Sequence, residues 1–218
     1  MKIRTVDELD TALDKDLSWR KKEITTLKFL IGGSRDHEKL ILKRAAITLM
    51  YSHWEGHLKK SAIVYLEYLN HKNLKQSDMT ENFSQICIGS EFDKGTKLSS
   101  FKSQKKVYEY FQDKNRRFSV VSDKVIKTES NLNTERLITI LYQLGLEIES
   151  FELRENFIDK IMLSKRNKIA HGEYIEPGIV EDTYRSLEDE LLTLIQSFHN
   201  LVKNSASNRS YYKPKIEV

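Results

Sequence analysis

The chain has 218 residues, 31% charged and 39% hydrophobic, and its formal net charge of +4 suits a polyanionic partner without requiring one. This is the ordinary balance of a soluble protein, with enough length for one good core or at most two small ones. A single cysteine excludes an internal disulfide framework and a cysteine-based zinc finger. The same single cysteine makes a reducing cytoplasm the expected compartment. The apolar runs are too short for a bilayer and the charged start lacks a signal-peptide apolar region, so we expect no membrane segment.

The sequence contains only two prolines and eight glycines, which favours long helices over a β architecture with many turns. We therefore predict an all-α fold. Thr5 followed by Glu8 is typical of a capping box, so a first helix is expected to begin there and to end at two consecutive glycines, residues 32–33. Ser34 is then expected to cap a second helix that runs to about Asn70. Its apolar residues occupy more than one face, which indicates a central helix packed by several neighbours.

Residues 71–103 are rich in asparagine, serine and glycine, and we predict an irregular insertion between helices there. Such an insertion is either a long loop or a lid or surface for substrate. Within it, residues 86–88 can form one short buried piece. A third helix is expected at 103–115, and weak alternation of apolar residues at 118–125 predicts a short extended piece.

The C-terminal half of the chain is expected to contain three further helices. The first spans residues 133–145 and begins at an asparagine and ends at a glycine, the second spans 151–171, and the third spans about 180–203. The polar, basic tail at 204–218 is expected to be flexible. We therefore predict a single helical domain over residues 1–203 followed by this tail.

Residues 163–172 read LSKRNKIAHG and hold the side chains best suited to chemistry on a phosphodiester. Arg166 offers a planar fork that matches phosphate oxygens, and His171 can give or take a proton near neutral pH. Gly172 is expected just past the helix end, which places His171 in the last turn, where the helix dipole favours an imidazolium. Asn167 and His171 share a face, whereas Arg166 and His171 are about 140° apart. Either the Arg166 side chain curls round, or His171 leaves the helical path, or a partner subunit supplies half of the site.

The RNKIAH stretch resembles the R-polar-x3-H signature of HEPN-domain proteins. Residues 49–59, which read LMYSHWEGHLK, and residues 17–23 are similar to the early helices of one subgroup, the MAE_28990/MAE_18760-like proteins. The resemblance covers most of the chain. It implies a HEPN-like helical bundle with long antiparallel helices, which is usually a homodimer. Many such domains are metal-independent endoribonucleases of toxin–antitoxin, abortive-infection or other antiviral defence systems.

The motif residues also fit the chemistry of RNA cleavage without a metal. The RNA 2′-hydroxyl attacks the adjacent phosphorus, which needs a base, an acid for the leaving oxygen, and positive charge on the phosphorane. His171 can be the base or the acid, Arg166 can hold phosphate oxygens, and Asn167 can orient the histidine or donate to the phosphate. The products would be 2′,3′-cyclic phosphate and 5′-hydroxyl ends, and DNA would not be cut. One histidine per protomer for two proton transfers favours a composite site at a homodimer interface.

Three further side chains are candidates near this site. Lys165 and Lys168 can track the RNA backbone, although lysines on an exposed helix face are common. The resemblance implies that Glu55 lies near the motif helix and orients Arg166 or His171. The alternative is that Glu55 is exposed and pairs with a lysine one turn on, while Arg166 forms a surface ion pair and His171 caps the helix.

His53 and His57 lie four residues apart in HWEGH and can share a face that binds a metal. The glutamate is not beside the first histidine as in zinc proteases, so we expect neither a metal nor a cofactor. Trp54 is expected in the core or an interface, and Gly56 in mid-helix indicates close approach of another helix. The alternative function is a non-catalytic HEPN-like dimer that binds RNA or nucleotide, or joins an antitoxin or a larger defence complex.

Overall fold

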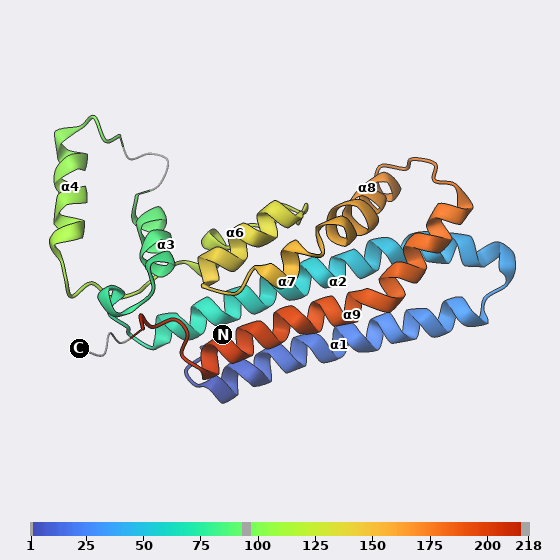
Figure 1. Ribbon diagram of the computed structural model, residues 1–218, viewed down its shortest axis with the longest axis horizontal. Coiled ribbons are helices and arrows are strands. Elements are labelled where there is room, and N and C mark those ends of the chain that lie inside the picture. Colours follow the sequence, from blue (N-terminus) through green and yellow to red (C-terminus); the bar gives the residue numbers. More distant parts are fainter. Residues whose placement is uncertain (1, 93–96, 215–218) are drawn as a thin grey trace.

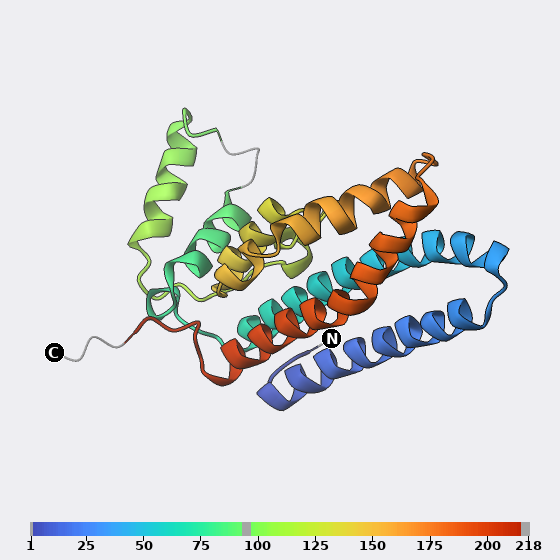
Figure 2. The same cartoon turned by 45° about the vertical axis from the view of Figure 1, so that its right-hand side comes forward.

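The computed structural model describes residues 2–92 and 97–214, which form an all-α bundle (Figure 1). Its elements in chain order are α1 (Val6–Gly33), α2 (Asp36–His71), η1 (Gln76–Asp78), α3 (Glu81–Glu91), α4 (Phe101–Gln112), α5 (Ser122–Val125), α6 (Thr134–Leu144), α7 (Glu149–Glu152), η2 (Asn156–Leu163), α8 (Ser164–Ala170) and α9 (Pro177–Ser207). The long helices α1, α2 and α9 run side by side, and α6, α7 and α8 lie along α2 (Figures 1 and 2). Within the described ranges no helix is long and apolar enough to cross a membrane.

The start of α1 is the capping box that the sequence predicts. The Thr5 hydroxyl accepts a hydrogen bond from the backbone N–H of Glu8, and the Glu8 carboxylate accepts one from the N–H of Thr5. The prediction for Ser34 is wrong. Its hydroxyl donates to the Ile31 carbonyl at the end of α1, and Arg35 stands at the N-cap of α2 instead. A hydroxyl between two helices can accept from the N–H groups at the start of the second helix or donate to the carbonyls at the end of the first. Here it donates to a carbonyl at the end of α1.

α2 is the central helix, as predicted, and contacts α1, α6, α8 and α9. Trp54 is fully buried, with Phe151 of α7 and Phe198 of α9 packed against its ring. Gly56 allows the Arg20 side chain to approach the α2 backbone closely. A Cβ atom there would lie 2.8 Å from the Arg20 guanidinium of α1, so it is a side chain rather than a helix backbone that occupies the space.

The segment 71–103 is more regular than we predict from its composition, because it contains η1 and α3. The expectation of an irregular insertion is therefore wrong for these residues. Phe83 anchors α3 in the core, and the Asn82 side chain donates to the Gln143 carbonyl of α6. The asparagine that suggests a loop instead makes a tertiary contact inside a helix. Residues 93–96 of this segment lie outside the described residues.

The extended piece predicted at 118–125 is also wrong in part. The second half of this segment forms the short helix α5. The first half is held in place by Asn70 of α2, whose side-chain amide donates to the Val120 carbonyl and accepts from the Val120 N–H. Because a side chain satisfies this backbone, no neighbouring strand is needed.

The predicted motif helix at 151–171 is divided into three pieces, α7, η2 and α8. In the π-helical segment η2 the hydrogen bonds reach one residue further back than in an α-helix. The N–H of Ser164, for example, donates to the carbonyl of Asp159. The last helix begins earlier than predicted, at Pro177, whose fixed φ suits the first turn of a helix.

The C-terminal residues continue the bundle beyond the predicted domain end. Residues 204–207, which we assign to the tail from the sequence, belong to α9. Tyr211 is buried with its ring against Tyr68 of α2. Residues 215–218 lie outside the described residues. Although the segment after residue 203 is mostly polar, the buried ring of Tyr211 attaches it to α2.

Candidate active site

The motif histidine stands at the end of α8, where the chain turns sharply. Gly172 has a φ of +74°. The N–H of Gly172 donates to the Ile169 carbonyl, and the N–H of Glu173 donates to the Lys168 carbonyl. This pair of hydrogen bonds is the Schellman motif, for which glycine in the left-handed region is favoured. His171 is therefore the C-cap residue, as Gly172 predicts, and its side chain is exposed to solvent.

Arg166 curls toward α2 rather than toward His171. Its guanidinium carbon lies 4.3 Å from the centre of the Tyr51 ring, a cation–π arrangement. One terminal nitrogen donates to the Ser130 carbonyl at 3.2 Å and to the Asn167 side-chain oxygen at 2.6 Å. The Nε–H is buried and has no hydrogen-bond partner among the described residues. The guanidinium is thus fixed in orientation with part of its donor capacity unused.

Tyr51 is the site residue that the sequence analysis missed. It is fully buried, and its hydroxyl accepts a hydrogen bond of 2.7 Å from the Leu132 N–H. Burial raises the pKa of the Tyr51 hydroxyl, and the nearby Glu55 carboxylate raises it further, so the phenol stays neutral. Tyr51 and Glu55 share a face one turn apart on α2, which is the signal that was available in the sequence. Glu55 thus lies beside the tyrosine on which Arg166 stacks, and a role of Glu55 in orienting Arg166 or His171 stays a prediction.

Asn167 and His171 border one shallow pocket with a volume of about 450 Å³. The other lining residues are Asn131, Asn133, Asp159, Leu163, Ser164, Lys168 and Glu173. The Asn167 amide also donates to the Asn131 side-chain oxygen at 3.2 Å. The structure thus brings Asn167 next to Arg166 and on the same pocket as His171. In the described part of the chain no hydrogen bond links Arg166 directly to His171.

The two flanking lysines lie differently on α8. Lys168 is exposed and lines the pocket, whereas Lys165 is half-buried. A role of either side chain in holding the RNA backbone stays a prediction. Lys168 has the position better suited to it, because it is next to both Asn167 and His171.

The histidines of the HWEGH stretch do not converge on one point. The Nε2 atom of His53 lies 3.0 Å from the Glu23 carboxylate, and the Nδ1 atom of His57 lies 2.8 Å from the Asp16 carboxylate. Across residues 2–92 and 97–214 no group of three His, Cys, Asp or Glu side chains forms a metal site. The two histidines instead tie α2 to α1.

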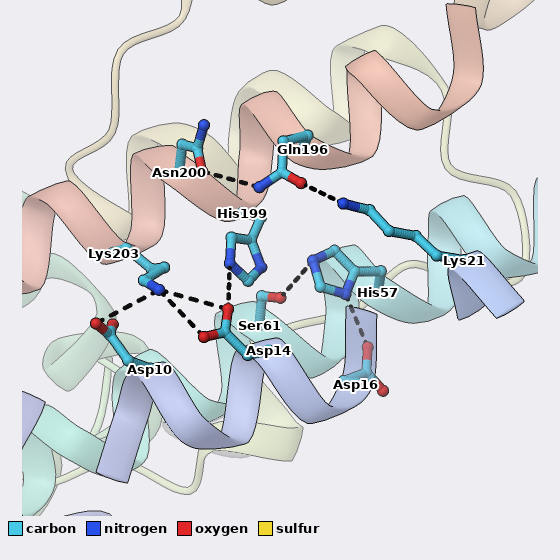
Figure 3. Close-up of polar contacts among 10 residues, drawn as sticks. All are labelled: Asp10, Asp14, Asp16, Lys21, His57, Ser61, Gln196, His199, Asn200 and Lys203. Atoms are coloured by element: carbon cyan, nitrogen blue, oxygen red, sulfur yellow. Dashed lines mark hydrogen bonds and ion pairs between the residues drawn. The ribbon is translucent and has the colours of Figure 1, made fainter. Parts of the chain in front are cut away.

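A buried polar network surrounds His57 (Figure 3). Asp16 accepts a hydrogen bond of 2.8 Å from Arg20 and contacts His57, whose other ring nitrogen lies 3.3 Å from the Ser61 hydroxyl. Burial by itself would raise the pKa of the Asp16 carboxyl, but the hydrogen bonds and charges of His57 and Arg20 lower it to about 2. The order serine, histidine, aspartate matches that of a hydrolytic triad. His57 and Ser61 are both 0% exposed, so no substrate reaches them and the network is structural.

The network continues to α9 through a second histidine. The His199 ring stacks on His57 at 5.5 Å between centroids, and its Nε2 atom lies 3.0 Å from Asp14 of α1 (Figure 3). Burial lowers the pKa of the His199 imidazole, and the neighbouring His57 acts in the same direction. The three long helices are thus joined by polar contacts as well as by the apolar core.

The structure therefore has an all-α bundle with an R-x4-H motif at the end of a late helix, which is similar to the arrangement that the resemblance to HEPN domains implies. In comparisons with known families, the model of the RiboL-PSP-HEPN family matches residues 15–204. The chain therefore belongs to the RiboL-PSP-HEPN family, which confirms the predicted HEPN fold. The finer assignment to the MAE_28990/MAE_18760-like subgroup stays a prediction. Comparisons with curated proteins and with solved structures gave no match.

Proposed function

We propose that this protein is a metal-independent endoribonuclease that leaves 2′,3′-cyclic phosphate and 5′-hydroxyl ends. Membership of a HEPN family supports a role as a ribonuclease or a nucleotide-binding protein. The observation that carries the finer proposal is the arrangement at the end of α8. An exposed histidine borders a pocket, and a fixed guanidinium lies behind it, joined to the pocket by Asn167.

In this proposal each side chain has one task. His171 moves a proton to or from the 2′-hydroxyl or the leaving 5′-oxygen, since it is exposed at the pocket. Arg166 stabilises the phosphorane charge, and the stack on Tyr51 holds the guanidinium in place before substrate binds. Asn167 connects the two by accepting from Arg166 while it lines the pocket of His171.

The second proton transfer is assigned to a second copy of the chain. Each protomer supplies one His171, and a two-fold interface would bring two copies of the same surface together. Tyr174 and Ile179, both close to His171 in the sequence, are 76% and 41% exposed. Exposed apolar side chains of this kind suit a surface that another subunit covers. We therefore propose a homodimer with a composite site.

The chemistry can be tested with wild-type protein and three substrates. In excess EDTA we expect cleavage of end-labelled RNA, and no cleavage of the same sequence made as DNA or as RNA with methylated 2′-hydroxyls. The reason is that the attacking group is the 2′-hydroxyl and no metal takes part. Mass analysis of the fragments should show cyclic phosphate ends. Activity that disappears with EDTA, or that cuts the DNA, would contradict the mechanism.

The role of the guanidinium predicts that Arg166→Lys loses activity although the positive charge remains. Removing one such preorganised donor typically costs a factor of 100 or more, so we expect kcat for RNA to fall about 100-fold. Arg154→Lys is the matched control, since Arg154 is a half-buried arginine that pairs with Glu190. Equal activity of Arg166→Lys and wild type would remove Arg166 from the site.

Two substitutions of Tyr51 separate the effect of its aromatic ring from that of its hydroxyl within the same experiment. Tyr51→Phe keeps the ring beneath Arg166 and should retain most of the activity. Tyr51→Leu removes the aromatic face and should resemble Arg166→Lys. If both variants lose activity to the same extent, the hydroxyl and its bond to the Leu132 N–H matter more than the stack.

A second candidate function has an observation in its favour. Arg166 donates to Ser130 and Asn167 within its own chain rather than to His171, as a structural arginine would. A HEPN dimer of this kind would bind RNA or nucleotide without cutting it, or serve as a subunit of a defence complex with an antitoxin-like partner. RNA binding without cleavage in the experiment above would favour it.

A further inference from the structure

One segment around the middle of the chain is strongly basic. Residues 97–117 contain seven lysine or arginine side chains and two acidic ones, a net charge of +5. The whole chain carries +4, so the remaining residues together carry −1. Helix α4 holds three of the seven basic side chains, and three more follow directly after its C-terminal end. Because the rest of the chain has almost no net charge, a polyanion would be attracted to this segment more strongly than to a surface of average charge.

The same helix exposes an aromatic face. Phe101, Tyr108 and Phe111 are 81%, 66% and 62% exposed. Their spacing places the three rings within about 80° of one another at roughly 100° per residue. Tyr110, the buried residue of α4, points to the opposite side. The orientation of the helix therefore leaves the aromatic face free for a ligand.

α4 stands apart from the helical bundle, at the end away from α8 (Figures 1 and 2). Its inner face is fixed by Tyr110, whose hydroxyl donates to Gln76 at 3.0 Å and whose ring lies 4.1 Å from the Arg116 guanidinium. Lys106 adds an ion pair of 3.1 Å with Glu91 of α3. These contacts hold the helix by one side only, so it projects its other side into solvent.

We propose that α4 is a platform for single-stranded RNA. Bases would stack on Phe101, Tyr108 and Phe111, while nearby lysines, Lys102 and Lys105 among them, contact the phosphates. Every base has a flat face that an exposed ring can cover, and clustered lysines supply the charge that the backbone needs. The choice of RNA as the polyanion rests on the proposed function, which needs an RNA substrate.

The composition of the aromatic face favours RNA over an anionic membrane. Gln104 lies between the rings and Gln112 borders the same face, so the apolar surface is flanked and interrupted by amides. A helix that inserts into a bilayer needs a continuous apolar face. Separate rings among polar groups suit stacking with bases, whose edges also form hydrogen bonds.

The test is the affinity of the full-length protein for a fluorescein-labelled oligouridine with methylated 2′-hydroxyls, which the proposed mechanism does not cut. About 20 nucleotides cover the roughly 4–16 that a stacking platform contacts. In the triple variant Phe101→Ala/Tyr108→Ala/Phe111→Ala we expect the dissociation constant to rise about 10-fold or more. Phe29→Ala on α1, which removes a ring that is 77% exposed, is the matched control and should bind like wild type.

A second variant tests the phosphate contacts separately. Lys102→Gln/Lys105→Gln should lower the slope of log affinity against log salt by about 1.4, since each contact to a single strand contributes about 0.7. Circular dichroism should show unchanged helix content in both variants, because the replaced side chains are on the surface.

Three results would overturn the platform. The first is that the wild-type protein does not bind RNA, and the second is that the triple variant binds RNA as wild type does. The third is that the triple variant keeps its RNA affinity but loses binding to phosphatidylserine vesicles or loses self-association. The proposed nuclease activity is judged separately. Cleavage of ordinary RNA with binding that does not depend on α4 refutes the platform alone. Binding that depends on α4 without any cleavage refutes the nuclease alone.

Discussion

His171→Ala is expected to lower the rate of RNA cleavage about 1,000-fold, within the range that general acid–base groups contribute. The side chain is exposed, and the helix end is closed by backbone hydrogen bonds of its neighbours, so the fold should be unaffected. The measurement is the initial rate on end-labelled RNA in excess EDTA, with wild type and variant at equal dimer concentration. His37→Ala, at an exposed histidine near the start of α2, serves as the control.

Mixing experiments extend this prediction to the composite site. If two protomers share one site, an excess of His171→Ala protein should lower wild-type activity more steeply than dilution does, because mixed dimers lack one of the two histidines. Equal cleavage by wild type and His171→Ala would mean a contaminant or a different site. The catalytic role proposed for the RNKIAH stretch would then be wrong.

Asp16→Ala is expected to lower the free energy of unfolding by about 3–5 kcal/mol, the usual effect of removing one partner from a buried ion pair. The change removes the carboxylate partner of the Arg20 side chain, which is 9% exposed, and of His57, which is 0% exposed, and leaves Arg20 only the His53 carbonyl as an acceptor. Urea denaturation at pH 7 measures the loss. Asp14→Ala is the matched control, because Asp14 is 57% exposed and should matter less. A loss below about 1 kcal/mol, the level of surface ion pairs, would contradict the importance of the network.

The pKa of Asp16 gives the same prediction a pH dependence. The folded carboxyl has a pKa of about 2, against an ordinary value of 3.8. The stabilisation is therefore complete above about pH 4 and is lost as the pH falls through 2, because the unfolded chain takes up its proton first. Wild type should lose stability over this interval, and Asp16→Asn should lose less. Parallel acid-unfolding curves for the two proteins would contradict this origin.

The parts of the fold that the sequence predicts correctly are those with local causes. The capping box of Thr5 and Glu8, the start of α6 at Asn133 and the left-handed glycines at 145 and 172 all act within one helical turn. The loop expected around Asn82 is wrong because the same side-chain amide that favours a loop also suits a hydrogen bond to α6. Local patterns do not distinguish these two uses.

In the candidate site, too, the features with local causes were predictable and those that depend on packing between helices were not. The location of His171 at a helix end follows from Gly172 and was predictable. The contact between Arg166 and Tyr51 was not, because it joins helices that are distant in the sequence and depends on how α8 packs on α2. His53 and His57 contact different carboxylates of α1, and this was not predictable either, because it depends on how α2 packs on α1. Spacing within a helix shows which residues share a face but does not reveal what that face meets.

The π-helical segment η2 sets the rotation of the helix that follows it. Each helical residue turns the chain by about 100°, so one residue fewer between Asn156 and Leu163 would rotate α8 by roughly that angle. Arg166 would then point away from Tyr51, although the RNKIAH stretch would be unchanged. If Arg166 acts as proposed, two family members with identical motifs are expected to differ in activity after a single insertion or deletion in this segment. The length of this segment should be compared together with the motif when active members are distinguished from inactive ones.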